Sequence, residues 1–394
     1  MIEIKDKANC CGCESCALVC PTKIIKMTSD AEGFIYPQIT DITKCINCNK
    51  CNNVCPQIKT TIQGRKIIKT YTGFSKNEFE IKQCASGGIA TSLTKSFIEN
   101  GGIAYGVQYS TDFKSVIYSR HDNINYIDRL RTSKYCSTRK FDIFNNVITD
   151  LKLDKKVLFI GLPCDIAAIY NFTKNKYSNL YTIELICHGV TSPKVQEETT
   201  NNLEKQYNSS IVDFSVRHKL NSWKPYYIFA KFKNGKEYIE LFRPTNYGIA
   251  FHYLKRPSCN KCKFKLNNSQ FGLQADITIG DNHGVRTDNQ SYNKWGSSVA
   301  FIHTDKGVEL INLIKDNFHI YESSSDLTKC NRAINEPIPA RINRNNYSKI
   351  FIKRGLDAAS KSLGVKFYDN YINVSTKLRS TLGKCKRYVL SKLR

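Results

Sequence analysis

The sequence has no long apolar run, and this absence limits the kinds of protein it can be. No stretch of the 394-residue chain approaches the roughly 18 consecutive apolar residues of a membrane-spanning helix. The first ten residues, MIEIKDKANC, carry charges where a secretion signal would be apolar. We therefore expect a cytoplasmic protein. Because reducing cytosol keeps thiols free, the 17 cysteines are expected to bind metal instead of forming a disulfide framework.

Acidic residues are also scarce, with 34 Asp and Glu against 59 Lys and Arg. Residues 1–60 are nearly balanced, with seven basic and six acidic side chains, whereas residues 341–394 hold fourteen basic and two acidic ones. The positive excess thus lies outside the cysteine-rich start of the chain. Such a surface could attract nucleic acid, an anionic membrane, an acidic redox partner or a phosphorylated substrate, and charge alone does not choose among them.

The seven histidines show no HExxH or other metal-binding pattern, so we expect hydrogen-bonded structural roles for them. His283 is the exception to watch, because it sits in the segment GDNHG directly after a predicted strand. No catalytic acid or base can be assigned from these patterns.

The cysteines themselves form one clear internal repeat. A Cys-x2-Cys-x2-Cys-x3-Cys-Pro run starting at Cys10 recurs 35 residues later, starting at Cys45. This run is typical of bacterial two-cluster ferredoxins, in which three cysteines hold one 4Fe-4S cluster and the fourth reaches the other cluster. A zinc site would favour two separated cysteine pairs around one tetrahedral ion, which fits this run poorly. The predicted ligands of the two clusters are Cys10, Cys13, Cys16 and Cys55, and Cys45, Cys48, Cys51 and Cys20; Cys11 is left over.

The rest of the chain alternates short apolar runs with amphipathic stretches, as in an α/β or mixed domain. Ser86 is placed to cap a helix that buries Ile89, Leu93 and Phe97 and ends at Gly101. Asn234-Gly235 predicts a hairpin turn, and the turn at residues 30–33 predicts a second, short hairpin. Strands are expected at 103–109, 156–161, 181–187, 275–280 and 297–304, and helices at 165–172 and 308–317.

Two further features admit more than one interpretation. Ser86-Gly87-Gly88 at a helix start could offer backbone N–H groups to a phosphate, although many helices begin so for packing reasons. Four cysteines, Cys164, Cys187, Cys259 and Cys262, could bind a metal, or the first two could be small buried residues and the Cys-x2-Cys pair could bind one zinc ion or nothing. Cys84, Cys136, Cys330 and Cys385 have no partners at ligand spacing and are expected to be core or surface thiols.

Taken together, these segments resemble the beta subunit family of coenzyme F420 hydrogenase/dehydrogenase. The resemblance extends over roughly residues 1–310 and includes several motifs in the family's order. It departs from the family where GDNHG stands in place of the usual GDxWG, and Cys84 and Cys136 stand where other residue types are expected. The motifs are the paired ferredoxin runs, CASGGIATSL, SKYCST, GLPCDIAAI, CHGVTSPKV, the Cys259/Cys262 pair and ADITIGD.

The resemblance implies an iron-sulfur flavoprotein. It places FAD against Ser86, Gly87, Gly88 and Thr91, with Ser133 and Lys134 nearby, and a third 4Fe-4S cluster on Cys164, Cys187, Cys259 and Cys262. The implied fold is a mixture of α+β and α/β structure in three parts: a bacterial ferredoxin-like module at 1–62, an α/β flavin-binding domain at 66–340 with parts 66–150 and 151–340, and a basic helical tail at 341–394.

The predicted function is that of an oxidoreductase that passes electrons between a ferredoxin-like carrier and FAD, which reduces or oxidises an organic substrate. Some relatives are associated with surface polysaccharide synthesis, so the family name does not establish the substrate. The alternative is a non-catalytic adaptor that relays electrons to a partner enzyme. The tail, with Lys384, Lys386 and Arg387, could contact a membrane or a partner protein, although a solvated helix is the simpler interpretation and nucleic acid is not expected.

Overall fold

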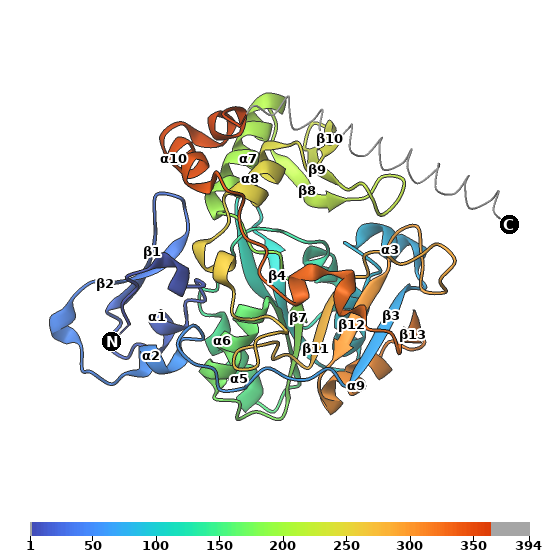
Figure 1. Cartoon of the computed structure of the whole chain (residues 1–394), viewed down its shortest axis with the longest axis horizontal. Coiled ribbons are helices and arrows are strands. Elements are labelled where there is room, and N and C mark those ends of the chain that lie inside the picture. The colour runs from blue at the N-terminus through green and yellow to red at the C-terminus, as the bar shows by residue number, and fades with distance from the viewer. Residues whose placement is uncertain (1, 364–394) are drawn as a thin grey trace.

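The computed structural model describes residues 2–363, and the N-terminal module lies at one side of the body (Figure 1). The module repeats one local unit: a 3-10 turn, a cysteine loop and a five-residue helix. The turns are η1 (Lys7–Asn9) and η2 (Ile42–Lys44), and the helices are α1 (Ser15–Val19) and α2 (Lys50–Val54). Between the two units, β1 (Ile25–Ser29) pairs antiparallel with β2 (Ile35–Ile39), which confirms the predicted short hairpin.

The body is built on an eight-stranded mixed sheet with the order β13-β3-β12-β11-β7-β6-β4-β5. The four central strands β11, β7, β6 and β4 run parallel, and the outer strands join them antiparallel. The strands are β3 (Lys69–Ser75), β4 (Ile103–Tyr109), β5 (Val116–His121), β6 (Val157–Gly161), β7 (Leu180–Leu185), β11 (Ile277–Asp281), β12 (Ser298–Ile302) and β13 (Phe318–Glu322).

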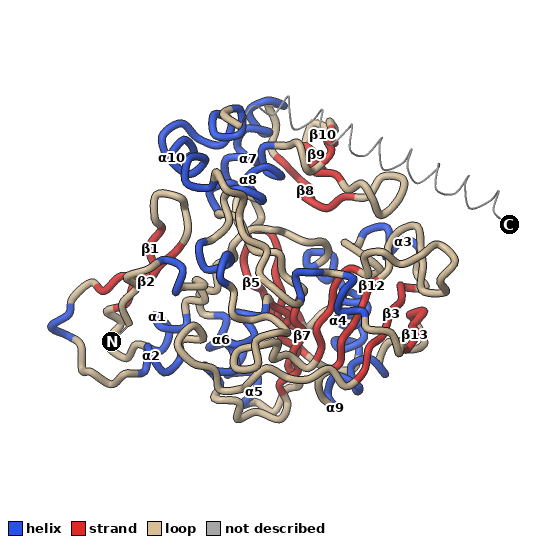
Figure 2. Tube along the Cα trace, viewed as in Figure 1, coloured by secondary structure: helices blue, strands red, loops and turns tan. Residues whose placement is uncertain are grey.

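Helices cover both faces of this sheet, as the tube view in Figure 2 shows. In β6, Val157 and Phe159 pack with α5 and α6, whereas Leu158 between them packs with α4 and α9. This alternation follows from the two-residue period of a strand, and it explains why the central strands are apolar on both faces. The helices are α3 (Glu78–Gln83), α4 (Ile89–Glu99), α5 (Ile143–Lys152), α6 (Pro163–Thr173) and α9 (Asp305–Asn312), with the 3-10 turn η3 (Ile124–Leu130).

A smaller unit packs beyond one end of the sheet, at the top of Figure 1. It combines the antiparallel strands β8 (Ile211–His218), β9 (Tyr227–Phe232) and β10 (Glu237–Leu241) with α7 (Pro193–Tyr207), α8 (Asn246–Tyr253) and α10 (Arg344–Lys361). Tyr347 and Phe351 of α10 are fully buried in its apolar core. The expected tail from residue 341 therefore begins as a packed helix, because its apolar face has a core to join. The cluster at Lys384, Lys386 and Arg387, like Cys385, lies outside the described residues.

The short 3-10 turns η4 (Pro257–Lys261), η5 (Leu327–Cys330) and η6 (Arg332–Ile334) complete the described elements. Within residues 2–363, no helix combines the length and the apolar character that crossing a membrane requires. The predicted strands, both hairpins and the helix after residue 162 are present, whereas the helix expected at 308–317 spans 305–312. The predicted cap at Ser86 is wrong: Gly88 is the N-cap of α4, and the Ser86 hydroxyl instead donates to the Ser297 carbonyl at 2.8 Å.

Candidate functional site

The eight cysteines of the ferredoxin repeat line two separate small cavities. Cys10, Cys13, Cys16 and Cys55 surround one, which we call the inner cavity, and Cys20, Cys45, Cys48 and Cys51 surround the other, the outer cavity. This is the exchanged grouping that the repeat predicts. It arises because each short helix carries one cysteine inside and the next cysteine at its C-cap, so the two thiols face different cavities.

The two cavities differ in their access to solvent. All four thiols of the inner cavity are buried, whereas Cys48 of the outer cavity is exposed. Burial, together with the nearby Cys13 thiol, raises the pKa of Cys55 to about 12. Thiols this close together in a dry site cannot all ionise unless a cation offsets their charge, and an iron-sulfur cluster would supply that cation. The described residues hold no group of three or more His, Cys, Asp or Glu arranged for a single metal ion.

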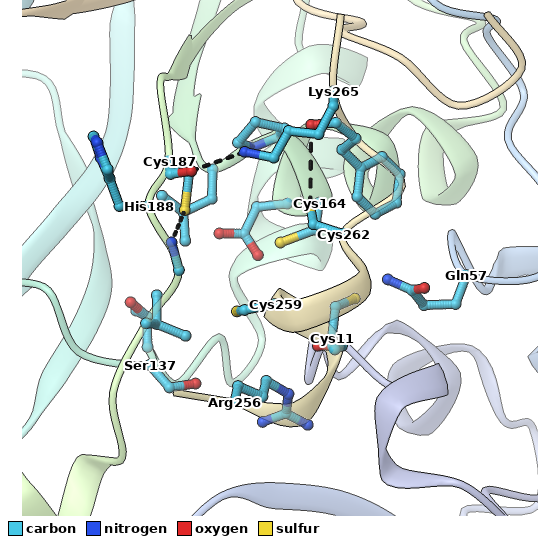
Figure 3. Close-up of a pocket in the computed structure, with 18 of the residues that line it drawn as sticks. Cys11, Gln57, Ser137, Cys164, Cys187, His188, Arg256, Cys259, Cys262 and Lys265 are labelled. Carbon is cyan, nitrogen blue, oxygen red and sulfur yellow. Dashed lines mark hydrogen bonds between the residues drawn. The ribbon is translucent and has the colours of Figure 1, made fainter. Parts of the chain in front are cut away.

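A third cavity is lined by the four remaining candidate ligands, Cys164, Cys187, Cys259 and Cys262 (Figure 3). Its volume, as the space open to the centres of water molecules, is about 40 Å³. The four thiols come from three segments of the chain. Cys164 is in the first turn of α6, Cys187 follows β7, and Cys259 and Cys262 lie in and directly after η4. The structure thus brings together residues that are nearly 100 positions apart in sequence.

The backbone next to Cys187 has a conformation and close contacts that favour glycine at position 189. Gly189 has φ +97°, and a Cβ atom there would lie 3.2 Å from Cβ of Cys259, so this position favours glycine on both counts. The Gly189 amide donates to the Cys187 sulfur at 3.3 Å, and the Lys265 ammonium donates to the Cys187 carbonyl at 2.9 Å. Both contacts hold Cys187 at the wall of the third cavity.

Burial affects thiols of the third cavity as it does those of the inner cavity. Burial raises the pKa of Cys259 to about 12, and the neighbouring Cys187 and Cys262 thiols add to this effect. Burial also raises the pKa of Cys262. Buried thiols that resist ionisation on their own, as Cys259 and Cys262 do, are suited to a cationic metal core, because metal binding replaces the thiol protons. The donor set of the third cavity therefore fits an iron-sulfur cluster.

Cys11, the residue left over in the sequence repeat, lies between two of these cavities. It lines both the inner cavity and the third cavity, and its side chain lies near those of Cys13 and Cys164. Figure 3 shows it beside Cys259 and Cys262. Nothing in the spacing of the repeat indicates this position, because it depends on how the module packs against the body.

A much larger cavity, of about 240 Å³ in the same measure, adjoins the third one. Ser86, Gly88 and Thr91 line it, as do Ser133 and Lys134. Gly87 does not line it. Its backbone packs against β3 and β12, where an added Cβ atom would lie 2.5 Å from the Gly73 carbonyl oxygen and 2.7 Å from the Ser298 amide nitrogen. We therefore assign Gly87 a packing role, and its contact with a cofactor stays a prediction.

The helix α4 begins at this large cavity. Its N-cap, Gly88, has φ +92° and supplies no side-chain hydrogen bond, so no cap side chain occupies the first N–H groups of the helix. The start of an eleven-residue helix is favourable for an anionic group such as a phosphate. Thr91 lies one turn along α4, where its hydroxyl is 3.2 Å from the Cys84 sulfur. This arrangement fits the phosphate end of a dinucleotide.

Charged residues of the large cavity are already engaged with other protein groups. The buried Lys134 ammonium donates to the carbonyl groups of Arg129, Arg131 and Thr132, and burial lowers its pKa to about 7. Arg217 pairs with Asp281 at 2.6 Å. Lys134 therefore holds the loop that follows η3 in place.

His283, which the sequence singled out, lies beside Asp281, with Nε2 3.4 Å from its carboxylate. Its ring stacks on Trp223 at 5.7 Å between centroids. An indole thus lies next to position 283 although the expected tryptophan is absent there. Sequence reasoning missed His188, which lines both the third and the large cavity and whose pKa burial lowers to about 4. Only its place directly after Cys187 could have indicated this.

The remaining cysteines have different positions. Cys84 and Cys136 are buried and line the large cavity, whereas Cys330 is half-buried. No disulfide joins the cysteines of residues 2–363.

The cavities follow one another through the molecule. The inner and third cavities share Cys11 and Gln57, and the third and large cavities share Cys187 and His188. The inner and outer cavities are joined through one apolar cluster that contains Cys16, Cys20, Cys51 and Cys55. Cysteine-lined sites therefore lead from an exposed thiol at the surface to a large cavity in the body.

Comparisons with known proteins agree with this arrangement. Residues 9–60 match the family model for a 4Fe-4S dicluster domain. Residues 154–326 match the family model for the C-terminal part of the beta subunit of coenzyme F420 hydrogenase/dehydrogenase. The chain therefore contains a region that matches a 4Fe-4S dicluster domain and a second region similar to oxidoreductase subunits. It is related to the coenzyme F420 hydrogenase/dehydrogenase beta subunits, as its motifs predict.

One curated relative and one solved structure are similar to parts of this chain. The coenzyme F420-dependent sulfite reductase of Methanocaldococcus jannaschii is 25% identical over 199 residues, which cover 49% of this chain and 30% of that protein. A structure of the F420-reducing nickel-iron hydrogenase complex from Methanosarcina barkeri aligns with 76% of this chain and 92% of that chain, at 17% identity and a TM-score of 0.44.

Proposed function

We propose that this protein is a cytoplasmic iron-sulfur flavoprotein that passes electrons between a ferredoxin-like carrier and FAD, which reduces or oxidises an organic substrate. The observation that supports this proposal most strongly is the succession of cavities through the molecule. Three groups of four cysteines lead from the exposed Cys48 to a cavity large enough to admit a small-molecule cofactor. An electron would pass from one site to the next without leaving the protein.

Each site would have a distinct role in this pathway. The outer and inner cavities would hold two 4Fe-4S clusters on the eight repeat cysteines, and the third cavity would hold another on Cys164, Cys187, Cys259 and Cys262. Clusters exchange single electrons, whereas a bound flavin can take up one or two and so connect them to an organic substrate. The protein residues position these groups and exclude water, since the inner thiols are buried.

FAD would occupy the large cavity with its phosphates at the start of α4. Ser86, Gly88 and Thr91 would lie along this end. The loop that carries Ser133 would cover it, in the conformation that the hydrogen bonds of Lys134 maintain. The third cavity would then lie against the flavin, because Cys187 borders both spaces. This shared wall favours direct electron transfer between the third cluster and the flavin.

Electrons would enter at the outer cavity. Cys48 is exposed there, and Ile42 and Ile46 place apolar side chains on the surface beside it. Lys50 is an exposed cation that lines the outer cavity, and Lys44, near it in sequence, is also exposed and pairs with Asp41 at 3.4 Å. An acidic carrier protein is the partner that this combination fits, since charge complementarity guides docking and exposed apolar groups can be buried on contact.

Anaerobic purification followed by measurement of iron, sulfide and flavin tests this proposal. We expect about twelve irons per chain, four for each cluster, together with FAD. About eight irons without flavin would instead support the alternative, a relay adaptor for a partner enzyme. Colourless protein that contains zinc would contradict both functions. Turnover by the isolated chain with an artificial reductant would further separate the enzyme from the adaptor.

A further inference from the structure

Arg256 lies at the junction of the N-terminal module and the body, between the inner and third cavities. It belongs to the segment that leads into η4, and only 1% of its surface is exposed. Its guanidinium group pairs with no carboxylate among residues 2–363, and its Nη1 atom has no hydrogen-bond partner there. A buried cation without a counter-ion costs several kcal/mol, so its surroundings require an explanation.

The contacts of Arg256 are directed at the first ferredoxin run. Nε donates to the Cys10 carbonyl at 2.8 Å, and Nη2 donates to the Ile35 carbonyl at 2.8 Å. Nη2 also lies 3.6 Å from the Cys10 sulfur. The ring of Tyr36 packs against the guanidinium, with its centroid 4.5 Å from Cζ. The positive charge is therefore fixed beside a sulfur atom of the inner cavity.

The backbone of the first run makes room for this guanidinium. Gly12 has φ +72°, and a Cβ atom there would lie 2.8 Å from both Cζ and Nη1 of Arg256. Any side chain at this position would displace the charged group. Arg256 lines the third cavity and reaches the inner cavity through its contacts with Cys10, and the carboxylate that lines the inner cavity, Glu14, is paired with Arg139. The outer cavity has no buried cation of this kind, since the one cation among its lining residues is Lys50, which is exposed to solvent. The two sites of the repeat therefore differ in charge although their cysteine spacing is the same.

We propose that Arg256 acts as the counter-ion of the inner 4Fe-4S cluster and raises its reduction potential above that of the outer cluster. This inference rests on the proposed function, because it requires clusters at both sites. A cluster held by four thiolates is negatively charged and becomes more so on reduction, so a fixed cation stabilises the reduced form. In the transfer step, the reduced outer cluster loses one electron and the inner cluster gains it, with no bond made or broken. Arg256 thereby draws the electron inward, toward the third cavity.

A redox titration monitored by electron paramagnetic resonance, on the full chain purified anaerobically, tests this role. In Arg256→Gln, we expect the potential of one N-terminal cluster to fall so that its reduction is at least tenfold less favourable, which is 59 mV for one electron. The potential of the other N-terminal cluster should not change. Arg256→Lys retains a cation but loses the two carbonyl contacts, so its shift should lie between those of Arg256→Gln and the unsubstituted protein.

Arg344→Gln is the matched control. Arg344 also joins the module to the body, but its guanidinium pairs with the Glu32 carboxylate and not with a cysteine. Its removal should leave both potentials unchanged. Equal shifts in the two glutamine variants would overturn the proposal, as would unchanged potentials in Arg256→Gln and Arg256→Lys. Should Arg256→Gln fail to fold, the lysine variant alone decides. Iron missing from the unsubstituted protein would contradict the proposed function instead.

Discussion

At the scale of single residues, a cysteine of the third cavity can be removed without altering the ferredoxin repeat. Cys259 lines the third cavity and neither of the other two cysteine-lined cavities. We expect Cys259→Ser to retain about eight of about twelve irons, because a cluster that loses one thiolate ligand is released while the two N-terminal clusters remain. Iron and sulfide analysis measures this. Cys330→Ser, at a half-buried cysteine that lines none of the three cavities, should retain all the iron. About twelve irons in Cys259→Ser would exclude Cys259 as a required ligand, and about eight irons in both the variant and the unsubstituted protein would exclude the third cluster.

His303 is a buried histidine whose titration should affect stability. Its Nδ1 atom is 3.0 Å from the Lys66 carbonyl and Nε2 is 2.8 Å from the Thr278 hydroxyl. Burial lowers the pKa of His303 to about 4, whereas an unfolded histidine has a pKa near 6.5. The unfolded chain therefore binds a proton first, and the stabilisation present above about pH 6.5 is lost as the pH falls toward 4.

We expect the free energy of unfolding to decrease by about 2 to 3 kcal/mol from this one group between pH 7 and pH 4. Urea unfolding at several pH values measures the effect. His303→Gln should show a smaller decrease than the unsubstituted chain, since glutamine does not titrate. His319→Gln removes an exposed histidine and should follow the unsubstituted protein. If both variants kept the full acid dependence, another group would be responsible.

At the scale of elements, the two glycines that flank α4 allow the effect of backbone strain to be distinguished from an effect on cofactor binding. Gly88 and Gly101 flank the helix with φ +92° and +80°. Alanine at either position should cost about 1 to 2 kcal/mol, because the left-handed conformation is unfavourable for a residue with a Cβ atom. Only Gly88 lines the large cavity. We therefore expect Gly88→Ala to lower the FAD content measured by absorbance, and Gly101→Ala to show the same loss of stability with normal flavin. Equal flavin loss in both would indicate a general folding effect.

The elements that sequence reasoning predicted are those with strong local patterns. Ile89, Leu93 and Phe97 share one face of α4, and the Asn234-Gly235 turn joins β9 to β10, as expected. The strands β3, β5, β8 and β13 were not predicted. β3, for example, pairs with β12 more than 200 residues later, so its stability comes from a distant partner and not from its own residue pattern. Ser86 failed as a cap for a related reason, because its hydroxyl donates to the carbonyl of Ser297, a distant residue directly before β12.

At the scale of the whole molecule, the repeat determines the exchanged cysteine groups through local spacing, so sequence alone could predict them. The third group required the family resemblance, since Cys164 and Cys259 come from distant segments. Cys11 and Arg256 could not be predicted by either route. Their positions depend on the contact between the module and the body. Neither a cysteine directly after Cys10 nor a single arginine forms a sequence pattern that predicts such a contact.

That contact also contains a paired charge that can be tested. The Glu32 carboxylate in the β1–β2 turn accepts hydrogen bonds from Arg344 at 2.9 and 2.6 Å and from the Ser348 hydroxyl. Both charged side chains are at most 15% exposed. We expect Glu32→Gln to destabilise the protein by about 2 to 4 kcal/mol, because it leaves a largely buried guanidinium without its counter-ion. Thermal unfolding measures this. Asp288→Asn, which breaks the exposed pair with Arg286, should change stability by less than about 0.5 kcal/mol.

The surface around the outer cavity leads to a prediction about the carrier. If an acidic ferredoxin docks beside Cys48, its rate of reducing this protein should fall as ionic strength rises, since salt screens the attraction between the two surfaces. Stopped-flow absorbance at increasing salt measures this rate. Reversing Lys44 and Lys50 to Glu should lower the rate at low salt by about tenfold or more, the range over which electrostatic steering alters association.

The matched control for this reversal is Lys205→Glu with Lys315→Glu, which changes the net charge equally on exposed residues of α7 and after α9. These positions belong to the body and line none of the cysteine cavities. Their reversal should lower the rate far less, because docking depends on charge near the point of electron entry and not on the total charge. Equal effects of the two pairs would indicate that the whole basic body attracts the carrier. Indifference to both salt and charge reversal would exclude an electrostatic partner at this face.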